Sequence, residues 1–236
     1  MVYVYAIAEG RGPVSGNGLE ERPLEAQVDR DVAVVFSCHD RNLPPSPENL
    51  WRHERVVESL MADHTLLPSR FGTTLRDEEA LAETIAPHVD ELIAGLERVR
   101  GCVELGVRVL LSSGSAEGVE GSGAPGSTGT SGRDYMLARL AEERRRRRTE
   151  ERAASLFDQV HEALVPLARD GTRLVVNGAV SVLKSAYLVE RDRTEHFRAR
   201  LRDVRSEHPD LRVLCTGPWP PYNFVPKLRL AEVRHA

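Results

Sequence analysis

The chain has 236 residues, of which 41% are hydrophobic, and its formal net charge at pH 7 is −4. This length allows one large domain or two small ones, and the apolar content is sufficient for a core. The mild negative charge argues neither for a nucleic-acid binder nor for a strongly steered electrostatic partner. No apolar run approaches the roughly 18 residues of a membrane span. The first ten residues lack the pattern of a secretory signal. We therefore expect a cytoplasmic chain whose three scattered cysteines, Cys38, Cys102 and Cys215, are reduced.

Residues 1–100 are predicted to form an N-terminal α+β domain. Residues 2–8 read as a strand, and residues 24–40 as a hairpin or one bent strand. Ser46 followed by Pro47 predicts the start of a helix. Its inner face is expected to carry Leu50, Val57, Leu60 and Met61.

An extended stretch and a second helix complete this domain. Pro68 and Gly72 interrupt regular structure in residues 66–75. Apolar residues then recur at helical spacing, and Pro87 is expected to kink or restart that helix. The residues on its apolar face are Leu81, Ile85, Leu92 and Leu96.

A tract of almost only Gly, Ser, Ala and Thr at residues 112–131 is predicted to be a flexible insert. It either separates two domains or lies inside one, and the flanking elements distinguish these readings. A strand at 102–111 precedes it, and a long helix at about 133–168 follows. The insert therefore lies within a second domain, and the domain boundary is expected near residue 100.

The rest of the chain continues as two strands, a helix and a last strand. Asn177-Gly178 lies between apolar runs and predicts a hairpin. Thr194 is expected to cap the helix, which Pro209 ends, and residues 211–217 form the last strand. Phe197, Leu201 and Val204 fall on one helix face. This order, βαββαβ, predicts a ferredoxin-like domain at 101–236, with an extended first helix and an extended tail at 217–236.

The run "EERRRRRTEER" at residues 142–152 resembles a nucleic-acid-binding patch at first. On a helix, however, its glutamates and arginines lie four residues apart, and each such pair stabilises a helix by about 0.2–0.5 kcal/mol. A helix segment that is polar on all sides is usually exposed to solvent. Three readings remain: a solvated helix, which the pattern favours, a protein-docking surface, and a nucleic-acid-binding patch. The residues concerned are Arg144, Arg145, Arg146, Arg147 and Arg148.

Patterns typical of enzymes are weak. His53, Asp63 and His64 lie near one helix but form no metal-binding spacing, and His53 is predicted to be a core-edge histidine. Ser69 and its neighbours Arg70 and Thr73 could bind an anion, but a loop that packs Phe71 into the core is the simpler interpretation. We predict no catalytic residues, no cofactor and no metal.

The segment "GPWPPYNFV" at residues 217–225 concentrates Trp219, Tyr222 and Phe224 in a chain poor in aromatic residues. Its prolines exclude a central strand or a helix interior and are expected to keep it extended. The aromatic side chains either join the two domains or bind a partner, and the sequence leaves both open.

Seven segments, taken together, resemble one known family. They are "YVYAI" at 3–7, "HERVVESLM" at 53–61, "LLPSRFGTTLRDEEAL" at 66–81, "ELGVRVLL" at 104–111, "GRDYMLARL" at 132–140, "SAYLVERDRTEHFRARL" at 185–201 and "TGPWPPYNFV" at 216–225. In this order they resemble the gas vesicle protein F/L (GvpF/GvpL) family. Residues 112–131, the approach to "AYLV" and the tail beyond residue 225 depart from the family pattern.

The resemblance implies an accessory protein of gas vesicles, without enzymatic activity, that takes part in vesicle assembly. It implies two domains, and binding to the hydrophobic major shell protein and to other accessory proteins at the inner, gas-facing side of the shell. It implies no nucleic-acid or membrane partner. The alternative is a cytoplasmic regulatory module that binds a small ligand through a ferredoxin-like domain; a tight pocket with converging polar groups would favour it.

Overall fold

The computed structural model describes residues 1–10, 14–111, 132–176 and 182–226. The insert predicted at 112–131 and the predicted Asn177-Gly178 turn lie outside the described residues. The chain divides into two compact units. Unit 1 comprises Met1–Leu105 together with the described residues from Gly217 onward, and unit 2 comprises Gly106–Thr216. The sequence analysis placed residues 217–236 with the second domain; the described residues of this segment, 217–226, instead belong to unit 1.

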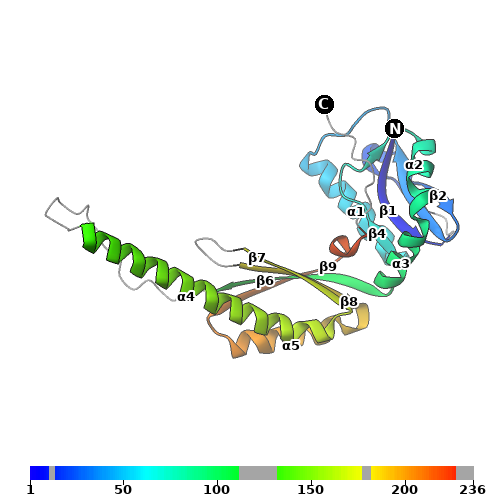
Figure 1. Cartoon of the computed structure of the whole chain (residues 1–236). Coiled ribbons are helices and arrows are strands. Elements are labelled where there is room, and N and C mark those ends of the chain that lie inside the picture. The colour runs from blue at the N-terminus through cyan, green and yellow to red at the C-terminus, as the bar shows by residue number, and fades with distance from the viewer. Residues whose placement is uncertain (11–13, 112–131, 177–181, 227–236) are drawn as a thin grey trace. The chain divides into compact units, whose positions relative to one another are not determined.

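Unit 1 contains a sheet with β1 near its centre (Figure 1). The strand order is β2-β3-β1-β4, and β5 also pairs with β1. The strands are β1 (Val2–Glu9), β2 (Glu25–Asp29), β3 (Val32–Cys38), β4 (Leu66–Pro68) and β5 (Thr74–Leu75). Residues 24–40 thus form a hairpin, with Asp29 opposite Val32.

The first helix of unit 1 begins where the sequence predicts, and the second is interrupted at the predicted proline. Helix α1 spans Pro47–Asp63, and the Ser46 hydroxyl accepts a hydrogen bond from the Asn49 amide at 3.2 Å. Pro87 lies in a 3-10 turn, Ala86–His88, between α2 (Glu78–Ile85) and α3 (Val89–Val99). Proline lacks the amide that a continuous helix requires, so the helix restarts there, as predicted. The predicted apolar face is buried at Leu81, Ile85, Leu92 and Leu96.

Helices lie on both faces of this sheet. Leu66 of β4 belongs to a cluster that includes Val56, Val57 and Leu60 of α1. The next residue, Leu67, points to the other face, where it lies against Gly95 of α3. Successive strand residues point to opposite faces of a sheet. Because helices cover both faces here, every residue of β1 from Val2 to Ala8 is buried.

The inner face of α1 differs from the prediction at Leu50. Leu50 is 41% exposed, whereas His53 is fully buried between Val57 and the sheet. His53 Nε2 lies 3.0 Å from the Ser69 carbonyl, so this nitrogen carries the proton, and Nδ1 accepts from the Tyr3 hydroxyl at 3.0 Å. The sequence analysis placed His53 at the edge of the core; the structure buries it fully, because both of its ring nitrogens are hydrogen-bonded.

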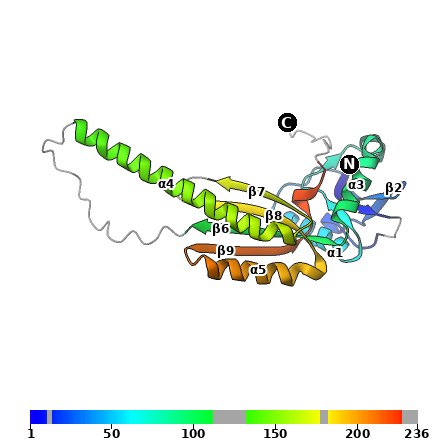
Figure 2. The same ribbon diagram turned by 60° about the horizontal axis from the view of Figure 1, so that its bottom comes forward.

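Unit 2 follows the predicted element order. It contains β6 (Cys102–Leu111), α4 (Gly132–Leu164), β7 (Asp170–Val176), β8 (Val182–Glu190), α5 (Thr194–Glu207) and β9 (Leu211–Trp219). The sheet order is β7-β8-β6-β9, and α4 and α5 lie on one of its faces (Figure 2). The chain leaves unit 1 within β6 and returns to it within β9.

Two details of unit 2 differ from the prediction. Thr194 is not a cap: a 3-10 turn, Arg191–Arg193, leads into α5, and the Thr194 hydroxyl donates to the Arg191 carbonyl at 3.0 Å. Strand β9 continues through Pro218 to Trp219, which is possible because β9 is an edge strand. The predicted apolar face of α5, Phe197, Leu201 and Val204, is buried.

We predict that His53 makes stability depend on pH. Burial lowers the pKa of His53 from 6.5 to about 4. The unfolded chain therefore binds a proton at this residue before the folded chain does, and stability falls as the pH decreases from about 6.5 to about 4. This term is on the order of 3 kcal/mol, at about 1.4 kcal/mol per pKa unit. Urea unfolding of the wild type and of His53→Gln, measured across this range, should give a flatter curve for the variant; parallel curves would contradict the assignment.

Candidate functional site

The C-terminal segment, residues 217–226, is anchored in unit 1. The sequence analysis expected this segment to be extended. After β9, however, the chain forms a 3-10 turn at Tyr222–Phe224. Phe224 is buried beneath Arg98 of α3, whose guanidinium carbon lies 5.7 Å from the ring centroid. Pro226 approaches Gly95, where an added Cβ would lie 2.8 Å from the proline ring. A glycine in α3 thus makes room for the returning chain.

A buried carboxylate fixes the same turn. Glu104 of β6 accepts from the Asn223 backbone amide at 2.8 Å and from the Asn223 side-chain amide at 2.6 Å. Burial raises the pKa of Glu104, and the two bonds from Asn223 act in the opposite direction. Gly217 allows the approach: its φ is +105°, and an added Cβ would lie 2.6 Å from the Glu104 carbonyl oxygen.

The three aromatic residues of this segment have different environments. The Tyr222 hydroxyl donates to Glu54 of α1 at 3.2 Å, and burial raises the pKa of Tyr222. Phe224 is buried, whereas Trp219 is 42% exposed. Tyr222 and Phe224 are therefore occupied within unit 1, and Trp219 is the one whose ring remains accessible.

The predicted arginine run lies on the first half of α4, which extends past the strands of its own sheet (Figures 1 and 2). The side chains of Arg144, Arg145, Arg147 and Arg148 are exposed; that of Arg146 lies outside the described part of the chain. The second half of α4 is buried through Ala153, Phe157, Val160 and Leu164. The start of the helix also exposes large apolar side chains, Tyr135, Met136, Leu137 and Leu140.

A buried relay of polar groups, not foreseen from the sequence, lies under the loop at Leu19–Glu21. The Tyr5 hydroxyl, the Ser37 hydroxyl and His39 Nε2 are joined by two contacts of 2.8 Å, and His39 Nδ1 lies 3.5 Å from Glu20. The Leu19 amide donates to Tyr5 at 2.7 Å. The order serine, histidine, carboxylate resembles a nucleophilic triad, but Ser37 is fully buried and bonded to Tyr5. No substrate carbonyl can reach it, so the relay stabilises the fold.

Among the described residues, Glu25, Cys38 and Glu78 place three possible metal ligands together. Burial raises the pKa of the Cys38 thiol, which disfavours the thiolate that binds metals. Both glutamates are exposed, and exposed acidic groups commonly lie together without a metal. The group does not make a metal centre.

Ser69, Arg70 and Thr73, which the sequence analysis considered for anion binding, do not form a common anion site in the structure. Ser69 is buried, and its carbonyl accepts from His53. The Thr73 hydroxyl donates to the Arg70 carbonyl at 2.8 Å, while Gly72 has a φ of +83°. Phe71 packs against Tyr3 and His53 with ring centroids 5.8 Å apart. The loop packs Phe71 onto the core, as the sequence analysis favoured.

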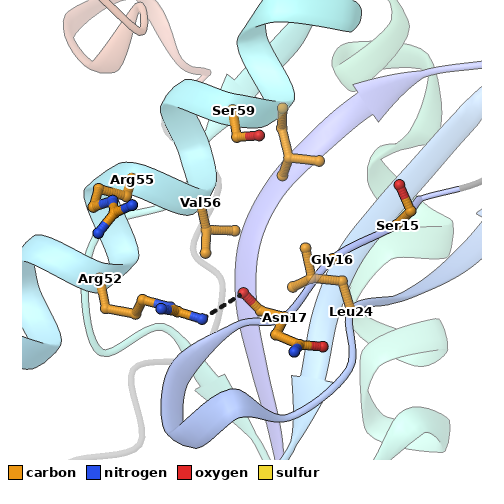
Figure 3. A pocket seen from close by; sticks show the side chains of 9 residues that line it. Ser15, Gly16, Asn17, Leu24, Arg52, Arg55, Val56 and Ser59 are labelled. Carbon is orange, nitrogen blue, oxygen red and sulfur yellow. Dashed lines mark hydrogen bonds between the residues drawn. The ribbon is translucent and has the colours of Figure 1, made fainter.

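One pocket of unit 1 has polar and apolar walls (Figure 3). Its volume is about 210 Å³, and it lies between α1 and the loop that precedes β2. The lining residues are Ser15, Gly16, Asn17, Leu24, Arg52, Arg55, Val56, Ser59 and Leu60. Ligand pockets for small molecules usually measure about 300–1,000 Å³, so this one is too small to support the regulatory-module alternative.

No helix among the described residues is long and apolar enough to cross a membrane.

Comparison with known proteins gives one consistent result. Residues 1–226 match the family model described as "Gas vesicle synthesis protein GvpL/GvpF". The chain is 34% identical to gas vesicle protein L of Streptomyces sp. (strain CB03234), with 94% of this chain and 91% of that protein covered. It is 27% identical to gas vesicle protein F of the same organism, with 94% and 98% covered.

Two crystal structures share the fold. The structure of GvpF from Anabaena sp. PCC7120 has a TM-score of 0.76 at 20% identity, with 95% of each chain covered. That of GvpF from Microcystis aeruginosa has a TM-score of 0.72 at 18% identity, with 94% of this chain and 98% of that chain covered. The mixed α+β fold with two antiparallel sheets is therefore common to all three chains.

We predict that Phe224, and not Trp219, carries the stability of the C-terminal segment. Phe224→Ala removes a fully buried ring and should lower the free energy of unfolding by about 3–5 kcal/mol. Trp219→Ala changes a partly exposed side chain and should cost less, about 1 kcal/mol. Chemical denaturation of both variants measures the difference. Equal losses would show that the exposed ring contributes as much as the buried one, against this assignment.

Proposed function

The chain belongs to the GvpL/GvpF family of gas vesicle synthesis proteins, and on this basis we propose that it assists vesicle assembly by binding the major shell protein. The proposal places the protein on the inner, gas-facing side of the shell within the cytoplasm. It acts there without catalysis, together with other accessory proteins. The match to the family model over residues 1–226 is the observation that carries this proposal.

The surface of the protein supports a binding role. Polar groups that could perform chemistry, such as Ser37 and His53, are buried and hydrogen-bonded in the core. The first half of α4, in contrast, exposes arginines beside large apolar side chains. A gas-filled shell needs subunits with a water-repelling face, and such a face aggregates before assembly unless another protein covers it.

The two units act as two domains in this proposal. We take unit 2 as the ferredoxin-like domain, and its element order βαββαβ and strand order β7-β8-β6-β9 support this assignment. The sequence analysis expects the domain boundary near residue 100, and the compact units divide after Leu105, within β6. Many unrelated proteins share this fold, so the proposal rests on the exposed side chains and not on the fold class.

The proposed contacts are made separately by the arginines of α4 in unit 2 and by Trp219 in unit 1. Arginine recognises carboxylates through several hydrogen-bond donors, and exposed charges at an interface mainly affect association rate and salt dependence. Tyr222 and Phe224 act indirectly, because they hold the segment that carries Trp219. The partner is therefore expected to present acidic groups.

We predict that the protein co-purifies with the major shell protein and that salt weakens the association. Changing Arg144–Arg148 to Gln should reduce the retained shell protein several-fold in 0.15 M salt and leave the melting temperature unchanged, because the described arginines of this run are exposed. A pull-down at low and high salt measures both effects.

A matched control carries five Arg→Gln changes at other exposed positions. These are Arg70, Arg108, Arg202, Arg205 and Arg212. If the control loses as much binding as the α4 variant, general charge and not α4 mediates the contact. Absence of association at any salt concentration would remove the proposed partner.

A further inference from the structure

The pocket beside α1 has a preformed outer wall. Arg52 donates to the Asn17 carbonyl at 3.4 Å (Figure 3). It also donates to the Gly18 carbonyl at 3.2 Å and forms an ion pair with Glu21 at 2.8 Å. The Leu24 amide donates to the Gly16 carbonyl at 3.0 Å. The bonds of Arg52 hold the loop against α1.

The loop also requires an unusual backbone, which fixes its position further. Gly18 packs so closely on Tyr5 that an added Cβ would lie 2.1 Å from the tyrosine oxygen. Gly16 has a φ of +116°, and Glu20 and Glu21 have φ values of +50° and +56°. Non-glycine residues in this region cost free energy and persist where the surroundings enforce them. The pocket is therefore a feature of the fold and not a gap between mobile segments.

The two arginines of the pocket differ in their partners. Arg52 is occupied by two carbonyls and a carboxylate. The Arg55 side chain is exposed and has no hydrogen-bond acceptor or anion among the residues that the structure describes. The neighbouring Glu54 accepts a hydrogen bond from Tyr222. Arg55 thus presents its donors at the pocket mouth to an anion from outside.

The floor of the pocket is aliphatic. Leu24, Val56 and Leu60 form it, and the Ser15 and Ser59 hydroxyls lie at its edge. At about 210 Å³ it is below the usual size for a small-molecule site. The dimensions suit one aliphatic side chain from a longer ligand, with its polar neighbour at Arg55.

An exposed aromatic residue extends this surface. Trp51 is 72% exposed and lies one helical turn before Arg55 on α1. Trp and Arg are the residues most enriched where protein interfaces concentrate their binding energy. A pocket beside a single arginine could bind a free carboxylic acid. The adjoining Trp51 instead favours a peptide that is long enough to contact both the pocket and the tryptophan.

We propose that this α1 pocket, together with Arg55 and Trp51, is a docking site for a segment of a partner protein that presents an aliphatic side chain next to an Asp or Glu. The aliphatic group enters between Leu24 and Val56, the carboxylate binds Arg55, and the following residues lie across Trp51. The site is separate in sequence from the arginines of α4, and its test does not depend on which vesicle protein binds there.

The test begins with an unbiased selection. Dodecapeptides displayed on phage are selected against the full-length protein, with Ser59→Leu as the counter-selection. Ser59 is exposed on α1, so a leucine there fills the pocket without disturbing the core. The proposal expects enriched peptides with Leu, Ile or Val beside Asp or Glu. No enrichment, or enrichment of sequences without this pair, overturns it.

Binding of the enriched peptides is then followed by fluorescence. The chain has two tryptophans, so Trp219→Phe leaves Trp51 as the only reporter. Arg55→Gln and Ser59→Leu should each weaken binding at least tenfold, and Arg55→Gln should remove the preference for Glu over Gln in the peptide. Ala62→Leu, on the exposed face of α1 outside the pocket, is the matched control and should leave the affinity unchanged.

Two outcomes would contradict the assignment. Equal effects of Ser59→Leu and Ala62→Leu would show that the pocket is not used. Binding of isovalerate, a free aliphatic acid, as tight as that of the peptide would identify a metabolite site and not a protein-docking site.

Discussion

The structure of unit 1 depends on the return of the C-terminal segment to a unit that begins at residue 1. Glu104 and Phe224 make this return specific: the carboxylate accepts both amides of Asn223, and the ring is buried beneath Arg98. A buried carboxylate is costly to leave unpaired, so the turn at Tyr222–Phe224 is not free to take another position. The aromatic residues near the end of the chain are therefore mainly structural.

This arrangement determines which surfaces remain for partners. The segment contacts α1 through Tyr222 and Glu54, and the pocket lined by Arg55 lies between α1 and the loop before β2. In unit 2 the sheet is covered on one face by α4 and α5, but the first half of α4 extends past the strands of this sheet. The proposed docking surfaces therefore use exposed arginines of α1 and of α4, which different experiments test.

The starts and interruptions of helices could be predicted from the sequence, because they depend on residues that are neighbours along the chain. Ser46 and Pro47 mark a helix start, and Pro87 restarts a helix, since both act through neighbouring backbone groups. Long-range contacts were not predicted. His53 replaces Leu50 in the core because Tyr3 and Ser69, distant in sequence, satisfy its nitrogens. The pocket was missed for the same reason: its walls come from residues 15–24 and 52–60, and no motif links them.

A double-mutant cycle on Glu104 and Asn223 tests the central claim most directly. Glu104→Ala, Asn223→Ala and the double variant are compared with the wild type by urea unfolding. If the pair holds the C-terminal segment in unit 1, the two single variants together should lose more free energy of unfolding than the double variant does. The difference, which is the coupling energy, should be about 0.5–3 kcal/mol. Losses that add without coupling would show that the pair does not hold the segment.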